Sequence, residues 1–253
     1  MMGYTHAAIG AAGALSLAAL NGDGSPALYI TAALAGAVGG VAVDTDTRDN
    51  LTNPKVTVTD AGRTRLAIVG LLGISILLDW FFKTGILMTA ISRQYTALTG
   101  LIVFAVALLI GFFSPHRTFS HSLLFIAITT IGVYCIYPDA AIYYCIGGLL
   151  HLLFDMLNNP FNNHGVWLLY PIKTGKGIAF GICKAARTGN KSCYFAGIIL
   201  FVGMSVFYFW RIGDVMKAIS PAIVLVYMVV AMHFVRQKSE KEQRHIMHMR
   251  GEL

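Results

Sequence analysis

The sequence predicts an all-α, polytopic integral-membrane protein: a helical bundle with about eight apolar segments. Hydrophobic residues make up 56% of the 253 residues and charged residues 12%, about half the charged share of a soluble domain. The mean hydropathy is +0.66. The apolar residues fall in blocks between short polar connections, as expected of helices that cross a bilayer. The composition therefore argues against a soluble globule, and it excludes a disordered chain, a collagen and a disulfide scaffold.

Eight apolar blocks follow one another along the chain. They span residues 7–20, 27–43, 66–82, 97–113, 122–137, 140–154, 194–210 and 218–235. Each is shorter than the ~20 residues that cross a bilayer core, so several must borrow flanking residues. The first block is rich in Ala and Gly, which lets helices approach closely. The fifth and sixth are divided only by the turn dipeptide Pro138-Asp139, so this pair could form a hairpin that enters the membrane without fully spanning it.

The distribution of Lys and Arg predicts the orientation of these segments. With eight spans, only Lys83, Arg93, Arg211 and Lys217 fall on one side, and the rest of the 19 Lys and Arg residues fall on the other. Cytoplasmic loops hold the positive excess, so the rich side, with both termini, is predicted to be cytoplasmic in a bacterial inner membrane. Orientation accounts for the net charge of +7, and no nucleic-acid partner is expected.

Seven residues of metal-ligand type are predicted to lie near the cytoplasmic face. They flank the ends of apolar blocks and are His6, Asp44, Asp46, His116, His121, His151 and Asp155. A charge or an imidazole at membrane depth is costly and is by default a functional residue. The orientation was drawn from Lys and Arg alone, so the gathering of these residues at one face is an independent observation.

The spacing of these residues favours ligands of a metal. His151 and Asp155 stand at i, i+4, which places both on one helical face. The alternative to metal binding is a His–Asp hydrogen bond that stabilises the end of the helix. His116 and His121 flank a short polar link, which needs no imidazole. The Asp-x-Asp of residues 44–46 predicts an irregular, strand-like stretch that presents oxygen ligands, with a solvated acidic loop as the alternative.

Together these residues predict a metal centre. Imidazole and carboxylate ligands without thiolates fit Zn best, and Mn or Fe next, and their number exceeds the three or four that a single catalytic zinc uses. A dinuclear site is therefore favoured, and the number of divalent ions is expected to be one or two. The predicted metal ligands are His6, Asp44, His116, His121, His151 and Asp155. A ligand carboxylate, or a nearby free carboxylate such as Asp46, is predicted to accept a proton from the attacking water. Arg117 is predicted either to stabilise anionic charge or to anchor at the lipid headgroups.

The same positions make the chain resemble the YdjM-type family of LexA-regulated, SOS-response inner-membrane proteins, which are regarded as metal-dependent hydrolases. The resemblance lies in MMGYTHAAIG, VAVDTDTRDN, SPHRTFSHSLL and GGLLHLLFDMLNNPFNNHGVWLLYP. It implies a hydrolase and assigns metal binding to the seven residues above, without supplying a substrate. We expect a metal-dependent hydrolase-like membrane domain over residues 1–171. Residues 172–253 are expected to form a loop, two further membrane helices and a basic cytoplasmic tail.

The expected function is hydrolysis of an ester or phosphoester at the cytoplasmic membrane face. Because the site is predicted at headgroup depth, the favoured substrate is a lipid or another amphiphile. One alternative is a metal-ion or proton transporter, which should place such residues near the membrane midplane. Another is a non-catalytic membrane scaffold with a structural metal, whose coordination should be closed. The sequence leaves the oligomeric state open.

Overall fold

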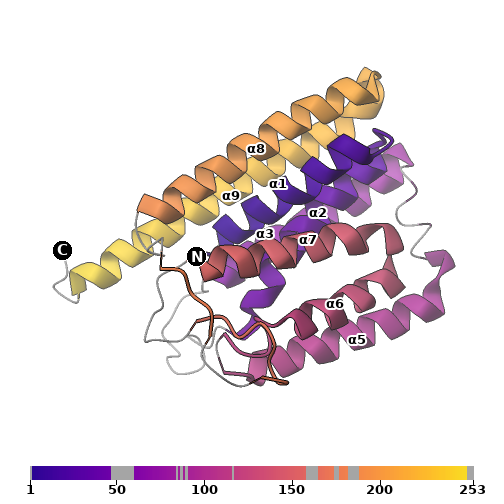
Figure 1. Cartoon of the computed structure of the whole chain (residues 1–253). Coiled ribbons are helices and arrows are strands. Elements are labelled where there is room, and N and C mark those ends of the chain that lie inside the picture. The colour runs from indigo at the N-terminus through magenta and orange to yellow at the C-terminus, as the bar shows by residue number, and fades with distance from the viewer. Residues whose placement is uncertain are drawn as a thin grey trace.

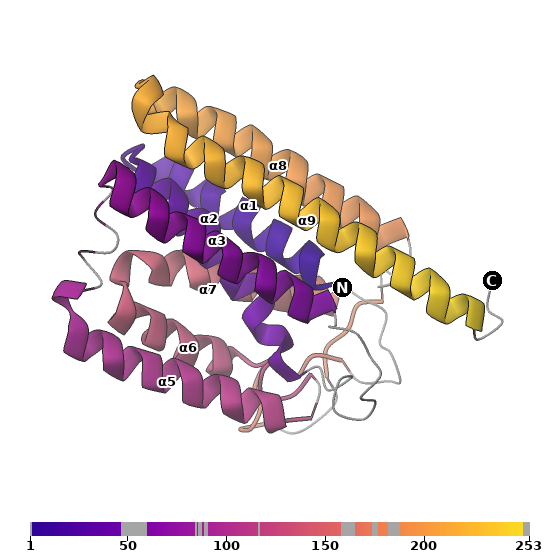
Figure 2. The same cartoon turned by 180° about the vertical axis from the view of Figure 1, so that it is seen from behind.

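The structure, a computed structural model, is a bundle of α-helices (Figures 1 and 2). It describes residues 2–46, 60–83, 85, 88, 91–115, 117–157, 165–173, 177–181 and 188–249. The long helices in these ranges are α1 (Gly3–Asn21), α2 (Pro26–Ala42), α3 (Asp60–Phe82), α5 (Gln94–Phe113), α6 (Leu123–Ile136), α7 (Pro138–Met156), α8 (Thr188–Ile212) and α9 (Val215–Met249). A 3-10 turn, η1 (Val43–Asp46), follows α2. The predicted all-α, polytopic architecture is confirmed, with one helix for each apolar block.

Five segments of the described chain are long and apolar enough to cross a membrane, so this is a multi-pass membrane protein. They are Pro26–Asp46, Gly62–Phe82, Gln94–Phe113, Gly189–Ile212 and Val215–His245. The apolar helix α6 is shorter. The helices α1 and α7 are not among the five, because small and polar residues lower their hydropathy. Helix α1 is almost wholly buried by its neighbours, so it has little need of an apolar face toward lipid.

Successive helices alternate in direction, which brings both termini to one end of the bundle (Figure 1). The start of α1, the turn η1, the start of α6 and the end of α7 also lie at this end, which we call the terminal end. The helices α8 and α9 lie along one side of α1, α2 and α3, and the pair α5 and α6 lies on the other side (Figures 1 and 2). The helices α1, α2 and α7 therefore form the inside of the bundle.

Glycines let these three inner helices touch backbone to backbone. A Cβ atom on Gly36 would overlap the carbonyl oxygen of Gly10, and one on Gly147 would overlap that of Gly36. A Cβ atom on Gly40 would overlap the carbonyl oxygen of His6. Small residues give membrane helices this close approach. The contact at Gly40 places the first turn of α1 directly against the last turn of α2.

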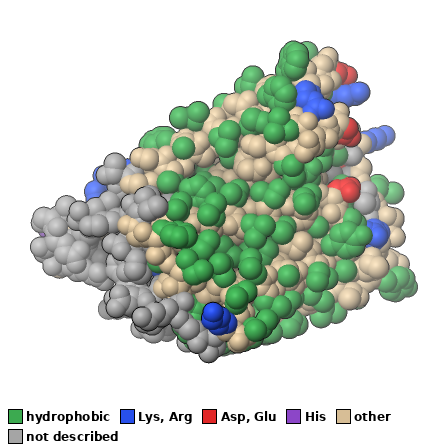
Figure 3. Space-filling view, viewed as in Figure 1, with side chains coloured by type: hydrophobic (Ala, Val, Ile, Leu, Met, Phe, Trp, Pro, Cys, Tyr) green, Lys and Arg blue, Asp and Glu red, His purple; other side chains and the backbone are tan. Residues whose placement is uncertain are grey.

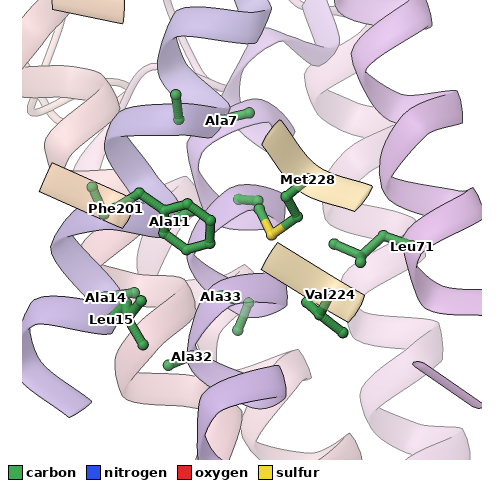
Figure 4. Close-up of a cluster of buried hydrophobic side chains, with 14 of the residues drawn as sticks. Ala7, Ala11, Ala14, Leu15, Ala32, Ala33, Leu71, Phe201, Val224 and Met228 are labelled. Atoms are coloured by element: carbon green, nitrogen blue, oxygen red, sulfur yellow. The ribbon is translucent and has the colours of Figure 1, made fainter. Parts of the chain in front are cut away.

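The core beside α8 and α9 is also built from small side chains (Figure 4). Alanines of α1 and α2 face larger side chains from the surrounding helices. The labelled members are Ala7, Ala11, Ala14, Leu15, Ala32, Ala33, Leu71, Phe201, Val224 and Met228, all of them buried. Large side chains on the outer helices thus fill the space that the inner helices leave.

The outer helices expose apolar side chains. Those with large exposed hydrophobic residues include α3, α5, α8 and α9, for example at Trp80, Leu101, Ile199 and Val226. Figure 3 shows apolar side chains across one face of the bundle, with charged side chains toward its ends. In a multi-pass membrane protein such a surface faces lipid, and its charged ends face water.

Candidate metal centre

The terminal end of the bundle collects buried His and Asp side chains from four separate segments. The first turn of α1 carries His6, and η1 carries Asp44 and Asp46. The link between α5 and α6 carries His121, and the last turns of α7 carry His151 and Asp155. The most exposed of these six residues, Asp44, is 7% exposed, and the others are 3% or less.

The Asp155 carboxylate lies at the centre of this cluster. Its Oδ1 atom is 3.2 Å from Nε2 of His6, and its Oδ2 atom is 3.4 Å from Nε2 of His121. The same Oδ2 atom is 3.7 Å from Nε2 of His151. On another side, Oδ1 of Asp44 lies 3.8 Å from Nε2 of His121 and 3.6 Å from Nε2 of His151. Three imidazoles and two carboxylates thus converge, and we call these five residues the His/Asp cluster.

Two groups within the His/Asp cluster have the spacing of metal ligands. The ligand atoms of His6, His151 and Asp155 all lie within 4.8 Å of one another, and so do those of Asp44, His121 and His151. The two groups share His151. This arrangement offers places for one or two ions, and the mixture of imidazole and carboxylate donors suits Zn, Mn or Fe.

The hydrogen bond of His151 determines which of its nitrogens faces the cluster. Its Nδ1 atom lies 2.7 Å from the carbonyl oxygen of Gly40. A carbonyl only accepts, so Nδ1 carries the hydrogen, and in the neutral imidazole the lone pair is on Nε2. The Nε2 atom is the one directed at the carboxylates. Gly40 therefore has two roles: its lack of a side chain lets α1 pack closely against α2, and its carbonyl orients His151.

The Asp46 carboxylate orients His121 in a similar way. Its Oδ2 atom lies 3.2 Å from Nδ1 of His121, on the side of the ring away from the cluster. The same oxygen accepts hydrogen bonds from the Ser120 hydroxyl at 2.7 Å and from the Arg117 backbone N–H at 2.8 Å. A carboxylate that holds the far nitrogen of an imidazole is the common support of a metal-binding histidine.

The two oriented imidazoles point at each other. The Nε2 atoms of His121 and His151 are 3.4 Å apart. If both rings are neutral, with their hydrogens on Nδ1, two lone pairs face one another beside the Asp44 and Asp155 carboxylates. Such an arrangement requires positive charge between them, either a proton or a metal cation. The donors present therefore fit a divalent ion.

His6 completes the cluster from α1. Its ring stacks on that of His151, with centroids 3.7 Å apart and an angle of 22° between the planes. Its Nδ1 atom is buried and makes no hydrogen bond to the residues that the structure describes. A buried polar nitrogen without a hydrogen bond is costly. A ligand at this position would remove that cost.

The segment that carries Asp46 differs from the prediction. We expected residues 44–46 to be strand-like, and they form the 3-10 turn η1, in which Asp44 is itself non-helical (φ −74°, ψ 24°). The turn continues α2 and directs both carboxylates toward His121, one to each ring nitrogen. The Arg65 guanidinium donates a hydrogen bond of 2.6 Å to the Asp44 carbonyl and fixes the turn from α3.

The link between α5 and α6 is held in an unusual conformation. Arg117 has φ +65°, a left-handed conformation that side chains disfavour. This conformation supports the hydrogen bond from its N–H to Asp46. Strained backbone of this kind is common at functional sites. His116 lies outside the described residues, so its assignment as a ligand stays a prediction.

The charges around His121 favour its protonated form when no metal is bound. Burial lowers the pKa of this imidazole, but the Asp46 and Asp155 carboxylates outweigh burial and raise it from 6.5 to about 10. A proton on His121 then supplies the positive charge between the facing Nε2 atoms. A metal ion that binds there must displace this proton.

Sequence reasoning missed the groups that support the ligands. The Gly40 carbonyl carries no side-chain signal, and Ser120 is an ordinary serine of a polar link when only the sequence is considered. Arg65 was counted only for orientation. A hydrogen bond from Ser120 to Asp46 spans 74 positions in sequence, so only the tertiary fold reveals it.

Comparison with protein-family models gave a match over most of the chain. A family model described as "YdjM inner membrane protein" matches residues 1–238. The match runs beyond residue 171 through α8 and much of α9. No curated protein and no solved structure matched the chain.

Proposed function

The chain belongs to the YdjM inner membrane protein family, and from that premise we propose that it is a metal-dependent hydrolase of the bacterial inner membrane. Its substrate is an ester or phosphoester on a lipid or other amphiphile at the cytoplasmic face. The observation that carries the proposal is the 3.4 Å approach of the His121 and His151 Nε2 atoms beside two carboxylates. Hydrogen bonds on the far side of both rings direct these nitrogens inward.

The proposed ligands are the five residues of the His/Asp cluster, with His116 as a further ligand. When bound, a divalent ion lowers the pKa of water toward neutrality and polarises the substrate oxygen. Asp44 is the most exposed carboxylate of the cluster, and it is our candidate to accept the proton of the attacking water. Substrate then approaches from the side of Asp44.

The geometry favours a positioning role for Asp46 over the proton-accepting role that the sequence suggested. Its Oδ2 atom already accepts hydrogen bonds from Ser120 and Arg117 and holds Nδ1 of His121. We retain for the Arg117 guanidinium the role of stabilising anionic charge, because this residue shares a short link with His121. In this proposal residues 1–171 contain the catalytic groups, and α8 and α9 support them.

The location of the His/Asp cluster favours a hydrolase over a carrier. All its members lie at the terminal end of the bundle, at the start of α1, on η1, before the start of α6 and at the end of α7 (Figure 1). A carrier needs groups near the midplane that are reached from both sides. We propose that the terminal end is cytoplasmic, since most of the Lys and Arg residues in the described ranges lie toward that end.

The orientation has its own test. Cysteines introduced into the connections 45–65 and 155–193 should resist an impermeant thiol reagent in intact cells and react after permeabilisation. A cysteine beside Lys83 should react in intact cells and serves as the control. Labelling of either long connection without permeabilisation would place the cluster on the other face.

The activity is tested with purified, reconstituted protein supplied with Zn, Mn or Fe. The substrates are bis(4-nitrophenyl) phosphate, 4-nitrophenyl esters and phospholipid vesicles. We expect metal-dependent turnover that His121→Ala and Asp155→Ala reduce to background, and that Ser205→Ala, distant from the cluster, retains. Turnover that persists in the His121→Ala/Asp155→Ala protein contradicts the proposal. Transport of metal or protons into vesicles without hydrolysis would instead identify a carrier, and loss of stability on metal removal without turnover would identify a scaffold.

A further inference from the structure

The first turn of α1 has no cap of its own. Its N-cap residue, Met2, makes no side-chain capping hydrogen bond, and Gly3 opens the helix. A first turn without a capping side chain depends on other groups of the protein to hold it in place. His6 belongs to this turn, since its N–H donates to the Met2 carbonyl at 3.2 Å. A proposed ligand thus sits on a helix end that the local sequence does not secure.

One side chain of α8 contacts the start of α1 at three points. The Oδ1 atom of Asn190 accepts hydrogen bonds from the Met2 backbone N–H at 3.1 Å and from the Thr5 hydroxyl at 3.0 Å. Its amide nitrogen donates to the Tyr4 hydroxyl at 2.9 Å. Asn190 is 3% exposed, and Tyr4 and Thr5 are as deeply buried. A single amide therefore holds three of the residues that precede His6.

Aromatic and ionic contacts fix Asn190's own helix in place. Tyr194, one turn further along α8, packs edge-on against Tyr4 with ring centroids 5.2 Å apart. The Arg236 guanidinium of α9 lies 5.3 Å from the Tyr194 ring centroid and pairs with Glu240 at 2.9 Å. The start of α8 is thus held against both α1 and α9.

We infer that Asn190 is a positioning residue that secures the first turn of α1 and thereby sets the His6 imidazole in the His/Asp cluster. This inference rests on the proposed metal site, and it gives α8 a part in that site beyond membrane anchoring. The Gly40 contact fixes the His6 carbonyl from one side, and Asn190 fixes the preceding residues from the other.

The alternative is that Asn190 only attaches α8 to the bundle. The chain offers a matched control, because Ser205 on the same helix makes a buried hydrogen bond of 2.9 Å with the Tyr29 hydroxyl of α2. Ser205→Ala removes a buried polar contact of α8 distant from the cluster. If Asn190 only packs α8 against the bundle, the two substitutions should have similar effects. If Asn190 positions His6, only Asn190→Ala should change how His6 takes part in metal binding.

The experiment compares wild type, Asn190→Ala, Ser205→Ala, His6→Ala and His6→Ala/Asn190→Ala as full chains in detergent. Co²⁺ is the probe, because its absorption spectrum reports how many nitrogens bind it. We expect Asn190→Ala to weaken Co²⁺ binding about 10- to 100-fold, as loss of an outer support of a ligand does, and to shift the spectrum toward that of His6→Ala. Ser205→Ala should change neither property, and the double variant should bind no more weakly than His6→Ala.

Hydrogen exchange of the metal-free protein gives a readout without metal. Amides of the first turn of α1 should exchange at least about tenfold faster in Asn190→Ala than in wild type or Ser205→Ala. Thr5→Val removes one of the three hydrogen bonds and should also speed the exchange of these amides. It replaces Asn190→Ala in the experiment if that variant does not accumulate in cells.

The outcomes separate this inference from the proposed function. If wild type binds no Co²⁺, the metal site fails. If hydrogen exchange of the first turn of α1 is also unchanged in Asn190→Ala and Thr5→Val, the securing role of Asn190 is overturned as well. If wild type binds Co²⁺ and His6→Ala weakens binding, but Asn190→Ala does not, the positioning role is overturned and the metal site stands. Equal losses in Asn190→Ala and Ser205→Ala also overturn it, in favour of general packing.

Discussion

The two ends of the bundle both bury polar side chains among their helices, but they satisfy them differently. At the end away from the termini, the Tyr29 hydroxyl pairs with Ser205, and the Tyr208 hydroxyl donates to the Ser25 carbonyl at 2.8 Å. The Arg211 guanidinium caps the carbonyls at the end of α1. Each of these contacts joins a donor to an acceptor. Such contacts stabilise a bundle and call for no ligand.

At the terminal end, the buried groups converge on a common point instead. The Nε2 atoms of His121 and His151 face each other, and the Asp44 and Asp155 carboxylates add negative charge beside them. The supporting hydrogen bonds all lie on the outer side of the imidazoles. Burial of polar residues therefore does not distinguish the two ends. What distinguishes the terminal end is that His121 and His151 are held at Nδ1 while their Nε2 atoms face each other, an arrangement typical of metal-binding histidines.

The largest expected effect comes from separating the inner helices. Gly40→Val should lower the free energy of unfolding by about 3 kcal/mol or more, because the new side chain overlaps the His6 backbone. It should also abolish metal uptake, while the far end keeps its contacts. Gly203→Val on α8 is the control, since nothing lies within 4 Å of a Cβ atom there. Thermal unfolding in detergent measures both variants. Equal unfolding temperatures for Gly40→Val and Gly203→Val would contradict the close contact between α1 and α2.

An intermediate effect is expected at the outer support of His121. Asp46→Asn keeps the shape of the side chain but removes its charge, so metal affinity should fall about 10- to 100-fold without a change in stoichiometry. Asp23→Asn is the control at the other end, where the carboxylate accepts a hydrogen bond from the Ser25 N–H. Equilibrium dialysis measures both. If Asp46→Asn abolishes stoichiometric binding altogether, Asp46 is a direct ligand.

The smallest expected effect is the change in metal affinity over a single pH unit. In the metal-free protein the Asp46 and Asp155 carboxylates raise the pKa of His121 to about 10, against the effect of burial. His121 therefore carries a proton at pH 7, and metal binding must release it. Apparent affinity should rise about tenfold per pH unit below that pKa. Calorimetry in buffers of different protonation enthalpy counts the proton, and His121→Ala should release about one fewer. Equal release by both proteins contradicts this assignment.

Sequence patterns predicted the helices because hydropathy is a local property. Each of the eight apolar blocks became a helix, and α9 extends the last block as one helix to Met249. The close packing of α1, α2 and α7 was visible only as a bias toward Ala and Gly. Which glycine faces which carbonyl depends on the tertiary arrangement, so Gly40 could not be singled out.

The sequence predicted the ligand-type residues of the site, because ionisable side chains at membrane depth are costly and rarely have a purely structural role. Imidazoles and carboxylates at helix ends are visible in a sequence, and the structure brings His6, Asp44, His121, His151 and Asp155 together. Their supports are ordinary residues such as Ser120 and Asn190, whose roles arise from contacts distant in sequence. The geometry of residues 44–46 was missed because a short Asp-x-Asp fits a strand and a 3-10 turn equally well.

Metal analysis of the full-length protein tests the central claim most directly. The protein is purified in detergent, incubated with Zn, Mn or Fe, and freed of unbound ions before analysis. We expect wild type and Ser205→Ala to retain about one to two equivalents of one of these metals, and His151→Ala/Asp155→Ala to retain none. Absence of metal from wild type, or equal metal in the doubly substituted protein, would contradict the claim that the His/Asp cluster is a metal centre.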